Sequence, residues 1–174
     1  MPVDPKKHYN QTMHNPPEHS KKGDSIMKHI LAAAILAVVS ATLVQADEIN
    51  WSTTIRPVFE KQCGACHGSE APEYAAFKKD KDAWLKKGSG MRMETYSHLV
   101  SFVGWPNTGA LMRRLDDGKG SQEGKSGNMY QHLGATEEER QKNLTLFKAW
   151  VGNWSLKRLP ETSKEDLNGI KVKY

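Results

Sequence analysis

The sequence predicts an all-α fold. Apolar residues recur at helical spacing, as Ile55, Val58 and Phe59 do, and no alternating β-branched run leads up to residue 63. Glycines separate the short helical segments from one another. Residues 136–152 carry the full set of helix signals, from an N-cap to a terminating glycine. These observations together favour helices joined by glycine-rich loops.

The N-terminal third reads as two segments that precede the folded domain. Residues 1–26 are polar, rich in His, Lys and Pro, and lack hydrophobic periodicity, so we expect a mis-assigned or disordered leader. Residues 27–46 combine a basic start, an uncharged apolar run and small residues before Asp47, which predicts a secretory signal peptide cleaved after Ala46. The apolar run is shorter than the ~20 residues that span a bilayer, and a retained N-terminal membrane anchor is the alternative.

Short helices are expected along the first part of the remaining chain. The first is entered from Ser52, with Pro57 tolerated in its opening turn, and later ones are stopped by Gly88 and Gly104. Residues 118–127 hold four glycines and no apolar residue, which predicts a loop. The expected helices cover residues 55–62, 72–87, 95–103 and 108–115.

The last helix, residues 136–152, has the clearest signals. Thr136 is its expected N-cap and Glu139 completes a capping box, with three acidic residues on the positive end of the helix dipole. Leu144, Phe147 and Val151 share one face, which must pack on something apolar. Residues 155–174 follow as a C-terminal tail that is frayed, clasps the domain, or docks onto a larger enzyme.

The chemistry of the chain is concentrated in Cys63-Gly64-Ala65-Cys66-His67. Each of the two thiols can add across one vinyl group of a haem, and His67 then lies where its imidazole can bind the iron. The chain has 2 cysteines and both are in this motif, so we expect one covalently attached haem c and no separate disulfide framework. Covalent haem attachment occurs outside the cytoplasmic membrane, which agrees with the signal peptide and predicts a periplasmic protein.

The cysteine pair has three other interpretations. A thioredoxin-like redox pair would sit after a strand, whereas helical spacing precedes Cys63. A zinc site would need a fourth ligand, for which only His98 or His132 is available, and an ordinary structural disulfide is the third. Nucleic acid is not an expected partner, because the net charge of +5 is not arranged as a basic stripe with interleaved aromatics.

From these pieces the chain resembles the class I cytochrome c superfamily. The resemblance rests on residues 55–59 before the haem motif, residues 95–99, residues 111–115, and a closing helix that begins Thr136-Glu137-Glu138-Glu139 and ends Ala149-Trp150-Val151. It implies a cytochrome c-like bundle of three to five short helices around one covalently bound haem, spanning residues 47–154. In that family the first and last helices cross beside the haem, and a methionine from the loop before the last helix is the second iron ligand.

The resemblance assigns the second ligand to Met129, seven residues before the Thr136 cap. The family usually has a proline after this methionine, whereas Tyr130 stands there in this chain. His132 is the alternative ligand, and it would lower the redox potential because a thioether raises the potential relative to imidazole. The remaining methionines are expected to pack in the core or to line the haem pocket: Met112, Met91 and Met93.

The expected function is one-electron transfer between redox partner proteins, and not enzyme catalysis. The alternative is an open distal site, used for gas sensing or a small peroxidase activity, toward which Arg92, His98 or His132 could point. A lysine cluster is either a solvated helix face or a patch that steers an acidic partner: Lys78, Lys79, Lys81, Lys86 and Lys87. No stable membrane span is expected after signal cleavage.

Overall fold

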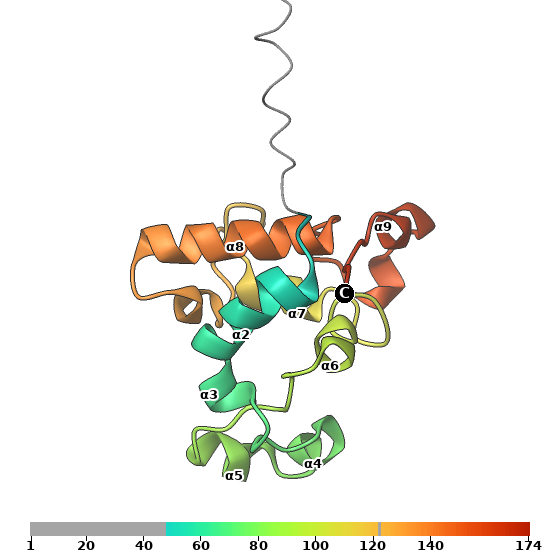
Figure 1. Ribbon diagram of the computed structural model, residues 1–174. Coiled ribbons are helices and arrows are strands. Elements are labelled where there is room, and N and C mark those ends of the chain that lie inside the picture. The colour runs from blue at the N-terminus through green and yellow to red at the C-terminus, as the bar shows by residue number, and fades with distance from the viewer. Residues whose placement is uncertain (1–47, 122) are drawn as a thin grey trace, which may run out of the picture. The chain divides into compact units, whose positions relative to one another are not determined.

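The computed structural model describes residues 48–121 and 123–174, and within these ranges it is helical with no strand (Figure 1). The expected leader (residues 1–26) and signal peptide (residues 27–46) lie outside the described residues. The elements, in chain order, are the π-helical turn η1 (Trp51–Ile55), α2 (Arg56–Gln62), α3 (Gly64–His67), α4 (Tyr74–Lys79), α5 (Lys81–Lys86), α6 (Tyr96–Val100), α7 (Ala110–Leu115), the 3₁₀ turn η2 (Tyr130–Leu133), α8 (Glu137–Val151), the 3₁₀ turn η3 (Leu159–Glu161) and α9 (Lys164–Asn168). The all-α prediction is therefore confirmed, with the expected segments divided more finely.

The first helical segment begins earlier than the sequence indicated. Asn50, and not Ser52, is its cap: the Asn50 Oδ1 atom accepts a hydrogen bond from the Thr53 backbone N–H at 2.9 Å. The π-helical turn η1 then leads directly into α2, and Pro57 lies in the first turn of α2. Trp51 and Ile55 of η1 are buried in the core.

The charged segment 72–87 is two helices and not one, which corrects the sequence expectation. At Asp80 the backbone leaves the helical region, with φ −145° and ψ 62°. The Asp80 carboxylate accepts from the Ala83 N–H at 3.3 Å and so caps the new helix α5. Helix α7 is also shorter than expected. The residue before it, Gly109, has a left-handed backbone conformation (φ 70°), which glycine can adopt without strain.

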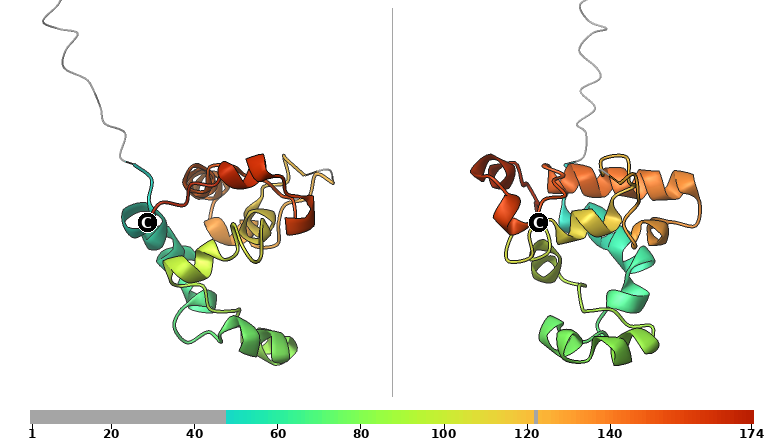
Figure 2. Two further views of the ribbon diagram at one scale, coloured as in Figure 1. Left: turned by 90° about the vertical axis from the view of Figure 1, so that its right-hand side faces the viewer. Right: turned by 180° about the vertical axis from the view of Figure 1, so that it is seen from behind.

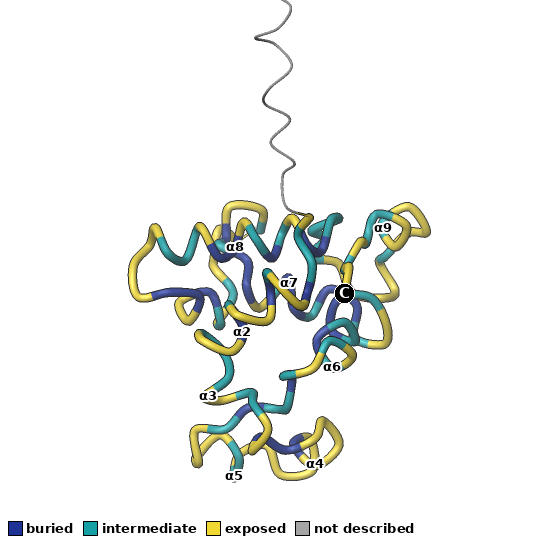
Figure 3. The backbone as a smooth tube through the Cα atoms, viewed as in Figure 1, coloured by how far each residue is buried: buried dark blue, intermediate teal, exposed yellow. Residues whose placement is uncertain are grey.

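The core lies under α8, the longest helix. Figure 3 shows buried positions along α8, η1 and α7, and the buried residues of α8 include Leu144, Phe147, Trp150 and Val151, as its apolar face predicted. The α8 N-terminus differs in one detail from the expected capping box. Thr136 does cap the Glu139 N–H, but the Glu139 carboxylate accepts from the Ala135 N–H at 2.9 Å.

The C-terminal tail folds back onto the domain (Figure 2). The Lys173 carbonyl accepts from the Trp51 N–H at 2.8 Å and from the Trp150 indole at 2.7 Å, so it joins η1 to α8. Lys171 and Val172 donate their backbone N–H groups to carbonyls at the end of α8. Of the three possibilities raised for this segment, the structure shows the clasp.

Candidate haem site

The haem motif lies on one tight helical stretch. Cys63 ends α2 and precedes α3, while Cys66 and His67 belong to α3 itself, and the Cys63 carbonyl accepts from the His67 N–H at 3.0 Å. Helical spacing of three residues brings the two thiols to the same side of the chain, as two thioether bonds to one porphyrin require. Helix α2 thus positions both attachment points at the edge of one cavity.

The state of the thiols argues against the other interpretations of the pair. Both are free. Burial, followed by the neighbouring Cys66, raises the pKa of Cys63 to about 12, whereas a reactive redox cysteine needs a lowered pKa. Among the described residues, no group of three or more His, Cys, Asp or Glu side chains gathers to hold a metal ion, which counts against the zinc site.

His67 is held in the orientation that an iron ligand needs. Its Nδ1 atom lies 2.6 Å from the Met91 carbonyl oxygen. A carbonyl can only accept, so Nδ1 carries the proton and Nε2 keeps the lone pair available to a metal. The segment after α5 is fixed beside the motif, because Gly90 donates its N–H to the Cys66 carbonyl and Met93 donates to the His67 carbonyl.

A cavity of about 640 Å³ opens beside these residues. Its wall is largely apolar and draws on α2 to α8 and the tail, including Phe59, Phe77, Leu99, Leu111 and Phe147. Its charged lining is one-sided: among the described residues it has four basic side chains, Lys81, Arg113, Arg114 and Arg158, and no acidic one. A haem would bring an apolar ring and two propionate carboxylates. The residues present therefore fit this group.

Both candidates for the second iron ligand line the cavity. Met129 is half-buried and packs against the core, and its backbone N–H donates to the Arg114 carbonyl at 3.0 Å. His132 is exposed, and its Nε2 atom lies 3.3 Å from the Gln131 amide nitrogen. The structure thus brings His67, Met129 and His132 to one cavity, and of the two candidate distal ligands Met129 is the more buried.

The other methionines lie as expected. Met91 and Met93 line the cavity, and the hydrogen bonds of their segment place them next to His67. Met112 is 1% exposed and packs in the core. Arg92 and His98, considered as distal groups, are absent from the described lining: Arg92 pairs with Glu94 and Glu73, and His98 Nε2 lies 3.4 Å from a Glu73 carboxylate oxygen.

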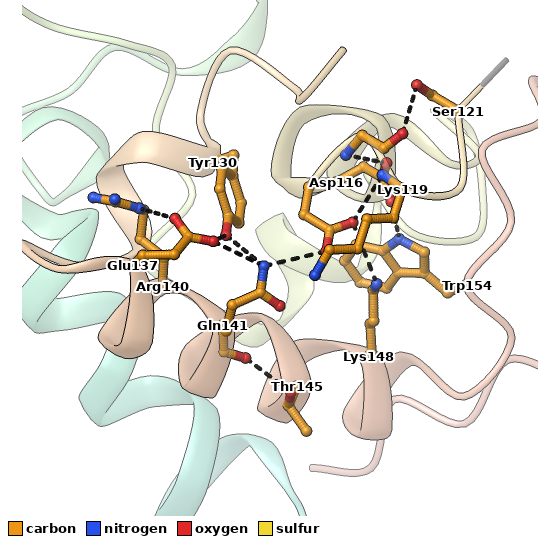
Figure 4. Close-up of polar contacts among 12 residues, drawn as sticks. Asp116, Lys119, Ser121, Tyr130, Glu137, Arg140, Gln141, Thr145, Lys148 and Trp154 are labelled. Atoms are coloured by element: carbon orange, nitrogen blue, oxygen red, sulfur yellow. Dashed lines mark hydrogen bonds and ion pairs between the residues drawn. The ribbon is translucent and has the colours of Figure 1, made fainter. Parts of the chain in front are cut away.

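A polar network behind Met129 anchors the candidate ligand loop to α8 (Figure 4). Tyr130 is buried, and its hydroxyl donates to the Glu137 carboxylate and accepts from the Gln141 amide at 2.7 Å. The hydrogen bond from Tyr130, followed by those from Gln141 and Arg140, lowers the pKa of Glu137 to about 2. Tyr130 therefore stiffens the loop at the position where the resembled family has proline.

The comparisons with known proteins agree with this geometry. The family model described as PccH Cytochrome c matches residues 50–174. The chain belongs to this cytochrome c family. A solved structure, that of the monoheme cytochrome PccH from Geobacter sulfurreducens, is 60% identical; the match covers 73% of this chain and 99% of that chain, with a TM-score of 0.69. No curated protein sequence matches.

Membership of this family confirms the cofactor prediction, one covalently bound haem c, and makes the chain an electron-carrier haem protein. The family model matches the chain through residue 174 and so extends over residues 155–174. The comparisons show a cytochrome c without specifying class I.

Sequence reasoning missed several parts of the site. The Met91 carbonyl and Gly90 beside His67 gave no local signal, since a backbone group is invisible in a sequence. The three cavity-lining arginines also went unnoticed, because Arg158 is 44 residues or more from the other two and only the folded tail brings them together. Their basic character was visible in the sequence, and their convergence was not.

Proposed function

We propose that this protein is a periplasmic one-electron carrier of the class I type. Cys63 and Cys66 form the two thioether bonds to the haem, His67 is the proximal iron ligand and Met129 is the distal one. When bound, the haem supplies an iron that alternates between Fe(III) and Fe(II). The chain's own task is to hold that iron with two fixed ligands and to keep water from it.

The observation that carries this proposal is the pair of donors on one cavity. The His67 imidazole is held by the Met91 carbonyl with Nε2 free. Met129 faces the same cavity from the loop before α8, as the distal ligand of class I proteins does, and Tyr130 and the Arg114 carbonyl hold its backbone. Two preorganised ligands require little rearrangement between the iron's oxidation states, which suits electron transfer.

The lining does not favour the open-site alternative. Peroxide cleavage needs an acid–base group near the iron. The described lining offers no carboxylate, and its one histidine besides His67, His132, is exposed. Arg92 is paired with two carboxylates and does not line the cavity.

Location and partners form the rest of the proposal. The signal-like residues 27–46 would export the chain, and the alternative is retention by an N-terminal anchor. In the described part of the chain no helix is long and apolar enough to span a membrane. The five lysines of α4, α5 and residue 87 are exposed, and Lys81 lines the haem cavity, which suits an acidic redox partner approaching this rim.

The tail is less suited to docking onto a larger enzyme, because the backbone groups of residues 171–173 already form hydrogen bonds with η1 and α8. Size-exclusion chromatography of the protein from its source tests this point. A monomer that accepts and delivers electrons fully would exclude the role of an obligate subunit.

The near-infrared absorption band that reports sulfur ligation of ferric iron tests the ligand set. We expect the band in wild-type holoprotein, its loss in Met129→Ala, and its retention in the matched variant His132→Ala. Ferrous wild type should not bind carbon monoxide. A missing band with ready carbon monoxide binding would move the function to gas binding or peroxide chemistry.

A further inference from the structure

We propose that the C-terminal tail completes the haem pocket with a carboxylate-binding recess, formed by Arg113, Arg114 and Arg158, that holds the haem propionates. The proposal rests on the proposed function above, since it assumes a haem attached at Cys63 and Cys66 in this cavity. It goes beyond that function because it gives the tail a role in the redox centre.

The recess is part of the haem cavity. It measures about 350 Å³ and is lined by Ala110, Arg113, Arg114, Asn128 and Arg158, each of which also lines the larger cavity. A carboxylate on a group bound in the cavity can therefore reach the recess. Two helical residues of α7 and one tail residue supply all of its charge.

The three guanidinium groups differ in exposure: Arg113 is half-buried, and Arg114 and Arg158 are exposed. Within the described residues none of them forms an ion pair with a carboxylate. Arg113 is held by neutral groups: its Nη1 atom donates to the carbonyls of Thr108, Leu156 and Lys157, at 3.1, 3.2 and 2.8 Å.

Arg114 and Arg158 likewise form no ion pair within the described residues. Arg114 donates to the Asn128 side-chain oxygen at 2.7 Å. The Glu161 carboxylate accepts from the Arg158 backbone N–H at 2.9 Å, and its negative charge acts to raise the pKa of Arg113. Burial and the neighbouring Arg158 charge lower the pKa of Arg113, as expected for a cation kept beside other cations. Three basic side chains and no acidic one line this part of the cavity wall, which makes it a favourable place for an anionic ligand.

The direction of attachment points to the propionates. The vinyl and propionate substituents of a haem lie toward opposite edges of the ring. Cys63 and Cys66, at the junction of α2 and α3, fix the vinyl edge. In Figure 2 (left), α7 and residues 159–168 lie across from α2 and α3, whereas the last residues of the tail return to η1. Arginine binds carboxylates in a planar, two-pronged geometry, which suits this task.

The same contacts tie the tail to the redox centre. Arg113 lines the recess and also holds the carbonyls of Leu156 and Lys157, so it positions Arg158 one residue further on. Loosening the tail would therefore release a positive charge from the haem environment. Positive charge near a haem favours the reduced iron, because Fe(II) carries one charge less than Fe(III).

The midpoint potential of isolated holoprotein tests the proposal. Arg158→Gln and Arg114→Gln should each shift the potential to more negative values, and Arg158→Lys should restore part of the shift. Arg56→Gln is the matched control, since Arg56 is exposed, pairs with Glu60 and does not line the cavity. A pH titration followed by NMR of the propionate carboxyl carbons gives the pKa values of the propionates. These pKa values should be raised in the two recess variants and unchanged in the control.

A carboxylate of an acidic partner protein is the other source of the same chemistry. In that case the variants would leave the potential and propionate pKa values of isolated holoprotein at the control values. They would weaken binding only to an acidic probe such as poly-glutamate, and this result would overturn the proposal.

The near-infrared band separates this test from that of the ligand set. A wild-type protein with the Met129-dependent band but unshifted potentials in the recess variants refutes the recess alone. Loss of the band in wild type, with shifted potentials in the variants, refutes Met129 ligation and leaves the recess standing.

Discussion

Replacing Gly90 by alanine should displace the proximal histidine. A Cβ atom built on Gly90 would lie 2.3 Å from His67 Cε1, 2.7 Å from Nδ1 and 2.9 Å from Nε2. Carbon atoms in contact are about 3.5–4.0 Å apart, so the ring must move by roughly 1 Å. That movement would stretch the 2.6 Å hydrogen bond between Nδ1 and the Met91 carbonyl, which fixes the tautomer of the ligand.

The cost of this substitution has two parts. Overpacking of a close contact costs about 1–3 kcal/mol, and the loss of one hydrogen bond costs about 1 kcal/mol. We therefore expect Gly90→Ala holoprotein to be about 2–4 kcal/mol less stable than wild type. Its ferric iron should also bind added imidazole more readily, because the bond from Nε2 is strained.

Urea denaturation and imidazole titration of purified holoprotein measure these two effects. Gly64→Ala is the matched control: Gly64 lies between the two cysteines, and a Cβ there meets only the Phe59 carbonyl oxygen at 3.9 Å. In helix α3 the control should be neutral or stabilising. If Gly90→Ala matched Gly64→Ala in both measurements, the packing of His67 against Gly90 would not constrain the ligand.

Three further outcomes follow from the contacts. Tyr130→Phe removes the hydroxyl that anchors the Met129 loop, so stability should fall by about 1 kcal/mol and ferrous protein should begin to bind carbon monoxide; unchanged carbon monoxide exclusion would refute the anchoring role. Glu137 has a pKa of about 2 against 4.5 for an ordinary Glu, so it stabilises the fold above pH 4.5 and loses that effect as the pH falls toward 2; acid unfolding followed by circular dichroism should be flatter over this range in Glu137→Gln. Deleting residues 170–174 removes the acceptor of the Trp150 indole and the three backbone hydrogen bonds that join the tail to η1 and α8. Thermal and urea unfolding should show a loss of about 2–5 kcal/mol, whereas a frayed tail would cost nothing measurable.

The features that could be predicted from the sequence depend on residues that are close together along the chain. Cys63, Cys66 and His67 are neighbours along the chain, so the haem motif was complete before folding was considered. The α8 cap was equally local, because Thr136 binds an N–H only three residues away. Local signals were not sufficient where two of them competed. Asp80 could continue a helix or cap a new one, and in the structure its carboxylate caps α5.

The sequence by itself therefore determined that the chain is helical and carries one covalently attached haem. The tertiary structure decided which groups surround that haem. The Met91 carbonyl that orients His67 is 24 residues away from it, and Arg158 lies near Arg113 only because residues 156 and 157 contact that α7 side chain. A covalent motif needs only adjacent residues. A pocket for a large flat ring needs walls on every side, and a chain can supply those only by bringing distant segments together.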